Sequence, residues 1–313
     1  MSKHTEKCDK EYLTITDERN TNEENLCIIN VSDNVCGNGN LHNNALSLNY
    51  PVSNCRNTKS SSLQSSGKHH NLKQGNLFHN WKFGTLNVRS GKEKLEGARM
   101  YAITKEVCRA NLSFCCLQEV RHRNTGKKLI ALNNGIQYSF LWCGQKKRRD
   151  AGVGILIKSE RGITFSEPDF KDPRVMALNI NVHGFKIRLV IGYSPTNTNG
   201  SEALKDEFYR NMKKACDLCP KHHKLIIAGD FNAETSLAYY KSEFDGTKVA
   251  PDDLCNENGL RLKSFSRSYK LCMPQTFFTK PLMNRYTSHG TVATVKRSKF
   301  STMYFCNDLL ISM

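Results

Sequence analysis

A carboxylate and an amide follow a short apolar run in the second half of this 313-residue chain. Residues 225–228 are all apolar, and Gly229, Asp230, Phe231 and Asn232 come directly after them. A run of this kind is typical of a strand that is covered on both faces. Because ligand sites in open α/β sheets lie just beyond the carboxyl ends of such strands, Asp230 and Asn232 are candidate site residues.

Three other predicted strands also end in polar residues that suit a metal ion or a phosphate group. These residues are Asn87, Glu119 and Tyr193. Taken singly, each has an ordinary explanation: a turn residue, an exposed acid, and a core ring with its hydroxyl at the surface. The recurrence at four strand ends favours one shared site.

The pattern from Trp81 onward alternates between strand and helix character, which predicts a layered, mixed α/β sheet domain. His183 and Gly184 separate two strands that are expected to form a hairpin. Ser201 is expected to cap a charged helix. The predicted strands are 83–88, 112–120, 153–157, 175–182, 187–191 and 225–228, and the predicted helices are 93–110 and 201–219.

The excess of basic over acidic residues is confined to the part of the chain that is expected to fold. Residues 1–80 are rich in Asn and Ser and are predicted to be largely disordered. They hold eight basic and eight acidic residues, so of the 46 Lys and Arg and 29 Asp and Glu, 38 and 21 remain in residues 81–313. A folded domain with this excess attracts polyanions, and nucleic acid is the expected partner. The alternative that composition leaves open is a basic surface whose charge only keeps the protein in solution.

The cysteines and the hydropathy of the chain argue against a disulfide-linked protein, a zinc protein and a membrane protein. The 13 cysteines include an adjacent pair in an apolar run, Cys115 and Cys116, and reduced intracellular thiols without disulfide partners are the simpler interpretation. Cys216, Cys219 and the histidines at 222 and 223 lack a second ligand pair for zinc. No apolar stretch approaches the roughly 20 residues that span a bilayer, so no membrane association is expected.

Together, five motifs resemble the endonuclease/exonuclease/phosphatase superfamily. The motifs are G-T-L-N-V-R, L-Q-E-V-R, G-V-G-I-L-I, Y-S-P-T and G-D-F-N-A. They are most similar to the apurinic-endonuclease-like domains of LINE-type retrotransposons and to the related craniofacial development protein 2 group. The resemblance covers residues 81–287. It implies a DNase I-like fold, a four-layer sandwich of two mixed β-sheets flanked by helices.

The resemblance also implies a role for each candidate residue. Glu119, assisted by the amide of Asn87, would hold Mg²⁺, with Mn²⁺ as an alternative, because such hard cations prefer oxygen ligands. Asp230 would orient or deprotonate the attacking water. Asn232 and Tyr193 would contact the scissile phosphate.

Two basic clusters are candidates for binding the nucleic-acid backbone. One contains Arg121 and Arg123, close to the predicted metal ligand, where steering of a polyanion is expected. The other could grip duplex DNA, serve as a nuclear import signal, which would favour the nucleus over the cytoplasm, or form a solvated turn. This second cluster consists of Lys146, Lys147, Arg148 and Arg149.

The C-terminal region departs from the family pattern. Thr276, Phe277 and Phe278 match a late family strand, but no Q-I-D-Y or S-D-H motif follows, and the nearest residue types are His289 and Asp308. Residues 288–313 are therefore expected to be a divergent tail and the last strands to be missing. Loss of the terminal acid and histidine is expected to slow catalysis by orders of magnitude.

The predicted function is a Mg²⁺-dependent phosphodiesterase that cuts DNA, impaired at its C-terminal end. One alternative is a non-catalytic nucleic-acid-binding module, which would bind duplex with a steep salt dependence. A second alternative is an enzyme acting on a small phosphoester or a phospholipid head group, which the charge of +17 argues against.

Overall fold

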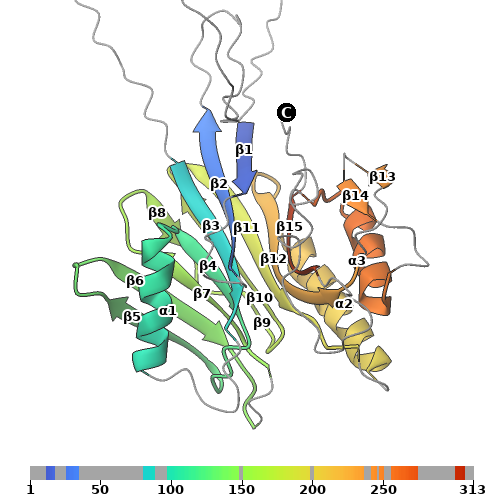
Figure 1. The fold of residues 1–313 in the computed structure, drawn as a ribbon, viewed down its shortest axis with the longest axis horizontal. Coiled ribbons are helices and arrows are strands. Elements are labelled where there is room, and N and C mark those ends of the chain that lie inside the picture. The colour runs from blue at the N-terminus through green and yellow to red at the C-terminus, as the bar shows by residue number, and fades with distance from the viewer. Residues whose placement is uncertain are drawn as a thin grey trace, which may run out of the picture.

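The computed structural model describes residues 12–17, 26–34, 80–88, 97–147, 151–197, 201–235, 241–244, 247–249, 255–273 and 300–306. Within these residues two β-sheets face each other (Figure 1). The strands are β1 Tyr12–Asp17, β2 Leu26–Asn34, β3 Asn80–Asn87, β4 Phe114–Gln118, β5 Thr125–Ala131, β6 Gln137–Cys143, β7 Val153–Lys158, β8 Ile163–Phe165, β9 Phe170–Lys171, β10 Val175–Val182, β11 Phe185–Tyr193, β12 Lys224–Ala233, β13 Lys241–Phe244, β14 Thr247–Val249 and β15 Phe300–Cys306. The helices are α1 Ala98–Arg109, α2 Glu202–Asp217 and α3 Glu257–Ser268.

Each large sheet contains one parallel pair at its centre. The first sheet has the order β1-β2-β3-β4-β7-β6-β5, and the second has the order β15-β12-β11-β10-β8, with β9 also pairing with β10. Strands β3 and β4 are parallel, as are β11 and β12. The carboxyl ends of these four strands are therefore the positions from which side chains can converge.

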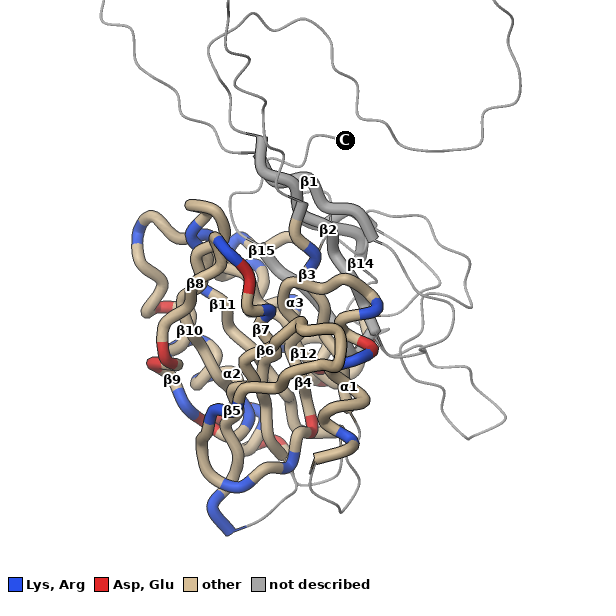
Figure 2. Tube along the Cα trace, turned by 90° about the vertical axis from the view of Figure 1, so that its left-hand side faces the viewer, with Lys and Arg blue, Asp and Glu red and all other residues tan. Residues whose placement is uncertain are grey.

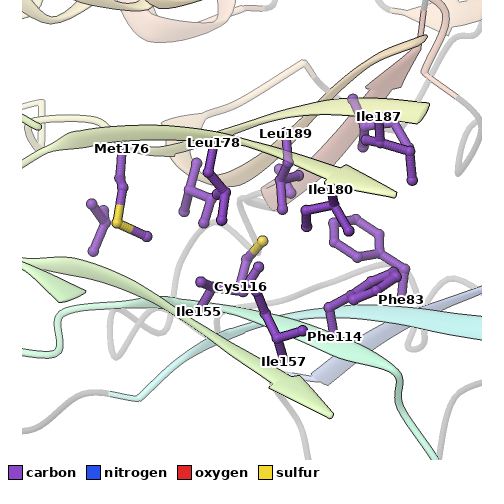
Figure 3. Close-up of a cluster of buried hydrophobic side chains, with 14 of the residues drawn as sticks. Phe83, Phe114, Cys116, Ile155, Ile157, Met176, Leu178, Ile180, Ile187 and Leu189 are labelled. Atoms are coloured by element: carbon purple, nitrogen blue, oxygen red, sulfur yellow. The ribbon is translucent and has the colours of Figure 1, made fainter. Parts of the chain in front are cut away.

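The main core lies between the two sheets, where alternate side chains from both inner faces interdigitate (Figure 3). Two further clusters lie on the outer faces, one under α1 and one under α2 and α3. The arrangement confirms the predicted four-layer α/β sandwich with flanking helices. Side chains on the inner core include Phe83, Phe114, Ile155, Leu178 and Leu189.

The predicted helices and hairpin form, with one difference in capping. Strands β10 and β11 pair across His183 and Gly184, and the Gly184 N–H donates to Asn181 Oδ1. Ser201 occupies the N-cap position of α2, but its hydroxyl donates to the Thr196 carbonyl instead of accepting from the helix. Among the described residues, no helix combines the length and the apolar character that crossing a bilayer requires.

The N-terminal region contains two strands, which corrects the expectation of disorder over those segments. Strand β1 pairs with β2, and β2 pairs antiparallel with β3 along most of its length. The sequence showed an apolar island at residues 26–31, and backbone pairing with the edge of β3 is the physical reason that it forms a strand. The rest of residues 1–79 lies outside the described residues.

The second sheet has a strand from the C-terminal tail at its edge, where the last strands were expected to be missing. Strand β15 pairs antiparallel with β12, from Ile226 opposite Cys306 to Ala233 opposite Phe300. Its sequence, F-S-T-M-Y-F-C, is rich in residues that favour strands. Pairing on both sides also extends β12 through Ala233, so that Asp230 and Asn232 lie within this strand and not beyond its end.

Candidate active site

The carboxyl ends of the two parallel pairs bring together the five candidate residues from the sequence. Asn87 lies at the end of β3 and Glu119 directly after β4, whereas Tyr193 ends β11 opposite Asp230 on β12. Asn87 Nδ2 donates to Asp230 Oδ2 at 2.7 Å, and Tyr193 OH donates to Glu119 Oε1 at 3.0 Å. Both hydrogen bonds join one sheet to the other, so the site depends on the packing of the sandwich.

Three donors converge on the carboxylate of Glu119. Asn87 Nδ2 lies 3.1 Å from Oε1, which also accepts from Tyr193, and Arg121 Nη2 lies 2.9 Å from Oε2. Burial alone would raise the pKa of Glu119, but the hydrogen bonds from Asn87, Arg121 and Tyr193 outweigh it, and the pKa is lowered. Glu119 is therefore an anion at neutral pH.

The segment that carries Glu119 has an unusual backbone. Glu119 and Arg121 have positive φ angles of 59° and 52°, in the left-handed backbone region that residues other than Gly and Asn rarely adopt. The intervening Val120 N–H donates to the Gly152 carbonyl at 3.1 Å and anchors this turn. Residues other than Gly that have a left-handed backbone cluster at functional sites, where the surrounding structure stabilises them.

Arg121 was predicted to steer nucleic acid, and the structure gives its guanidinium a second role. It forms an ion pair with Glu119, and the two side chains are 22% and 16% exposed. The contact with phosphate stays a prediction. The sequence did not signal the ion pair, because it depends on the left-handed backbone at Glu119 and Arg121, which no local pattern predicts.

Tyr193 is a hydroxyl donor and not a base in this arrangement. Burial, followed by the nearby charge of Glu119, raises its pKa well above the usual value. Arg174 lies beside it, with its guanidinium carbon 5.1 Å from the ring centroid and Nη1 3.2 Å from the Tyr193 carbonyl oxygen. Sequence reasoning did not identify Arg174, because a single arginine before β10 carries no motif.

Asn232 has a left-handed backbone, with φ 46°, that redirects the chain beside Asp230. Its backbone N–H donates to Asp230 Oδ1 at 3.1 Å, and its Nδ2 donates to the Ser194 carbonyl at 2.9 Å. Asn197 and Asn256 donate to the Asn232 carbonyl at 3.2 and 3.1 Å. The carboxylate of Asp230 is thereby oriented, and it is only 5% exposed.

Asn256 and Asn258 belong to α3 and were not predicted as site residues. Asn256 caps α3, with Oδ1 accepting from the Gly259 N–H. Asn258 is fully buried, donates to the Pro195 carbonyl at 2.8 Å and accepts from Ser194 Oγ. An Asn before an acidic first helical turn is a typical N-cap, and this was the one available signal.

Gly229 is required for close approach of β11 and β12. A Cβ atom at this position would lie 1.9 Å from the Gly192 carbonyl oxygen. The backbone of the neighbouring strand cannot move away without breaking the pairing of Tyr193 with Asp230. Gly229 therefore allows β11 and β12 to lie close enough for Asp230 to pair with Tyr193.

The second basic cluster is only partly described. Lys146 and Lys147 are exposed beyond the end of β6, and Arg123 is exposed near the site, whereas Arg148 and Arg149 lie outside the described residues. Basic positions are more frequent than acidic ones along the described trace (Figure 2). Binding of nucleic acid by these side chains stays a prediction.

The donor set fits a hard divalent cation. In the part of the chain that the structure describes, no site gathers three His, Cys, Asp or Glu side chains. Magnesium does not need three, because it usually retains water molecules and is bound through one or two carboxylates and substrate phosphate. Glu119, Asp230 and the amide of Asn87 provide oxygen donors of this kind, and a hydrogen-bond network joins them.

Replacing Arg121 by Met is expected to weaken the fold at neutral pH but not in acid. The variant loses a charged donor to Glu119, so the folded-state pKa of Glu119 rises towards its unfolded value. The stability that a lowered carboxylate pKa provides is present above the unfolded pKa and is lost as pH falls through the folded pKa. Thermal denaturation should therefore show a loss of about 1–2 kcal/mol near pH 7 that disappears as the pH falls through the folded-state pKa of Glu119.

The exposed Arg123 provides the matched control for this change. Arg123→Met removes the same charge and should alter the stability by less than about 0.5 kcal/mol at either pH. An equal, pH-independent loss in both variants would show that Arg121 does not hold Glu119 ionised.

Residues 84–291 match the model of the Endonuclease/Exonuclease/phosphatase family. Two curated relatives are craniofacial development protein 2 from Tragulus javanicus and from Bos taurus, each 25% identical over 205 residues. The match covers 65% of this chain but only 33% and 32% of those proteins, so the chain aligns with about a third of their length.

Two solved structures are similar to this chain at low sequence identity. The endonuclease domain of TRAS1, a telomere-specific non-LTR retrotransposon, is 16% identical with a TM-score of 0.44, covering 72% of this chain and 84% of that one. An AP endonuclease from Archaeoglobus fulgidus is 15% identical with a TM-score of 0.46, covering 72% and 85%. The family resemblance predicted from five motifs is confirmed by the family match, which includes all five. The chain belongs to the endonuclease/exonuclease/phosphatase family.

Proposed function

We propose that the chain is a divalent-metal-dependent phosphodiesterase that cleaves the backbone of DNA. The observation that carries this proposal is the cluster of Asn87, Glu119, Tyr193 and Asp230, joined by hydrogen bonds of 2.7–3.1 Å from two sheets. Two carboxylates side by side serve both needs of phosphodiester hydrolysis, because one can hold a cation while the other handles the proton of water. The excess of basic residues over acidic ones suits a polyanionic substrate.

The chain's own residues have separable roles in this reaction. Asp230 accepts the proton of the attacking water, and the Asn232 N–H at 3.1 Å fixes the orientation of its carboxylate. Glu119 and the amide oxygen of Asn87 would hold Mg²⁺, and the ion would supply positive charge against the phosphate oxygens. Tyr193 stays protonated and holds Glu119 in place through its hydroxyl.

Catalysis by this chain is expected to be slow. The acid and the histidine that the family resemblance places near the C-terminal end have no counterpart in sequence, and His289 and Asp308 lie outside the described residues. A positioned acid or base typically contributes about 10²–10⁴-fold in rate. The metal-holding and water-activating parts of the site remain, so hydrolysis should be reduced and not abolished.

Nicking of supercoiled plasmid DNA tests the proposal. Purified full-length protein is expected to nick the plasmid with Mg²⁺ or Mn²⁺ and to stop when EDTA is added. Glu119→Ala should show no nicking above buffer, while Glu167→Ala, which removes an exposed glutamate paired with Lys127, should retain the activity. Nicking that persists in EDTA or in Glu119→Ala would contradict the proposal, and so would complete inactivity of the unmodified protein with either metal.

A further inference from the structure

A cavity of about 310 Å³ lies on the outer face of the first sheet, between the start of α1 and strands β5 and β6. Met100 of α1 closes one side, and His122, Phe140 and Trp142 form the aromatic side. Lys128 and Leu129 of β5 also contribute to the lining. The volume is at the lower end of the range of small-ligand sites, which is roughly 300–1,000 Å³.

The aromatic wall is rigid. The rings of Phe140 and Trp142 stack with centroids 5.0 Å apart, and the ring of His122 lies 4.9 Å from that of Trp142. The Trp142 Nε1–H donates to the Arg123 carbonyl at 3.3 Å, which fixes the plane of the indole. Gly126 provides the necessary space, because a Cβ there would lie 2.2 Å from the indole ring.

The cavity lies beside the catalytic end of the first sheet. The guanidinium of Arg99, in the first turn of α1, donates to the carbonyl of Val88, the residue after Asn87. On the other side, His122 directly follows Arg121, which pairs with Glu119. A nucleic-acid strand whose phosphate reached Glu119 would therefore pass close to the cavity.

The chemistry of the lining matches a nucleotide. None of its residues is acidic within the part of the chain that the structure describes, and the Lys128 side chain is exposed at the rim. Aromatic rings combined with basic side chains are the elements with which proteins bind unpaired bases.

We propose that this cavity receives an unpaired base of the DNA strand bound at the candidate active site, with Lys128 beside the strand's phosphates. The inference rests on the proposed function for its substrate class and adds a preference for DNA in which a base near the scissile phosphate is unpaired. Stacking of one base on an aromatic side chain contributes about 5–100-fold in affinity.

Two oligonucleotides of equal charge separate stacking from phosphate binding. One is single-stranded oligothymidylate of about 12 nucleotides, and the other is an abasic sugar-phosphate chain of the same length. Both are titrated into full-length protein in EDTA, so that no cleavage occurs. The oligothymidylate should bind about 10-fold more tightly and should quench tryptophan fluorescence, whereas the abasic chain should not quench it. The chain has two tryptophans, and Trp81 is buried, so the signal reports Trp142.

A matched pair of variants locates the effect. Lys128→Glu places a carboxylate at the cavity, and Lys105→Glu makes the same change of charge at an exposed lysine of α1 that does not line it. Lys128→Glu should weaken binding of oligothymidylate about 10-fold and remove the quench. Lys105→Glu should retain both the affinity, within about 2-fold, and the quench.

The result is independent of the nicking assay. Equal affinity for the two oligonucleotides, or equal quenching by both, would overturn the base-binding cavity while leaving phosphodiesterase activity intact. Base-dependent quenching with no nicking would support the cavity and count against the proposed function alone. Loss of the quench in Lys105→Glu as well as in Lys128→Glu would also overturn the assignment to this cavity.

Discussion

Asp230→Asn is expected to lower the rate of plasmid nicking by about 10²–10⁴-fold while the fold stays intact. An amide keeps the size of the carboxylate and presents an oxygen to Asn87 Nδ2, which lies 2.7 Å from Oδ2 in the structure. It cannot accept a proton from water at neutral pH. The loss should therefore appear in the single-turnover rate constant at saturating protein and not in the midpoint of thermal denaturation.

Asp206→Asn is the matched control for the change at Asp230. Asp206 lies on the exposed side of α2 and pairs with Arg261, so the substitution removes a charge without reaching the site. Its nicking rate should equal that of the unmodified protein within about 2-fold. A small effect of Asp230→Asn, or an equal effect of both variants, would contradict the role of Asp230 as proton acceptor.

Gly229→Ala is expected to destabilise the fold by about 3 kcal/mol and to disrupt the site. The new Cβ would lie 1.9 Å from the Gly192 carbonyl oxygen, so β11 and β12 must separate at the point where Tyr193 pairs with Asp230. Urea denaturation measures the loss in the free energy of unfolding. Nicking should be lost even at temperatures where the variant is folded, because Asp230 is displaced.

Gly135→Ala separates this steric effect from the effect of adding a methyl group to any glycine. Gly135 has φ 82°, but a Cβ there would meet no atom within 4 Å. Only backbone strain remains, which costs about 1–2 kcal/mol, and nicking should be unchanged. If Gly135→Ala destabilised as strongly as Gly229→Ala, steric contact with Gly192 would not be the cause.

Strand ends carry local signals, because an apolar run followed by a polar residue indicates both the strand and the edge at which it ends. These signals, together with the family resemblance, selected Asn87, Glu119, Tyr193 and Asp230, and the structure brings the four side chains together. The βαβ unit around α1 and the hairpin of β10 and β11 are local in sequence and were also predictable. The four-layer arrangement followed from the family resemblance.

Contacts between distant parts of the chain could not be predicted in the same way. Strand β15 pairs with β12 across some 70 residues, and the choice of edge depends on the completed sheet. The ion pair of Arg121 with Glu119 requires the left-handed backbone at both residues, which no propensity indicates. Asn258 contacts the segment that follows Tyr193 only because α3 packs beside Ser194 and Pro195.

The central claim is that residues from two sheets act as one hydrolytic centre, and a double-mutant cycle tests it most directly. Single-turnover nicking rates are measured for the unmodified protein, Glu119→Gln, Asp230→Asn and the double variant. Residues that act as a unit are not additive, so the double variant should be no slower than the slower single variant. Losses that multiply across the two sites, or a double variant that nicks as fast as the unmodified protein, would contradict the account.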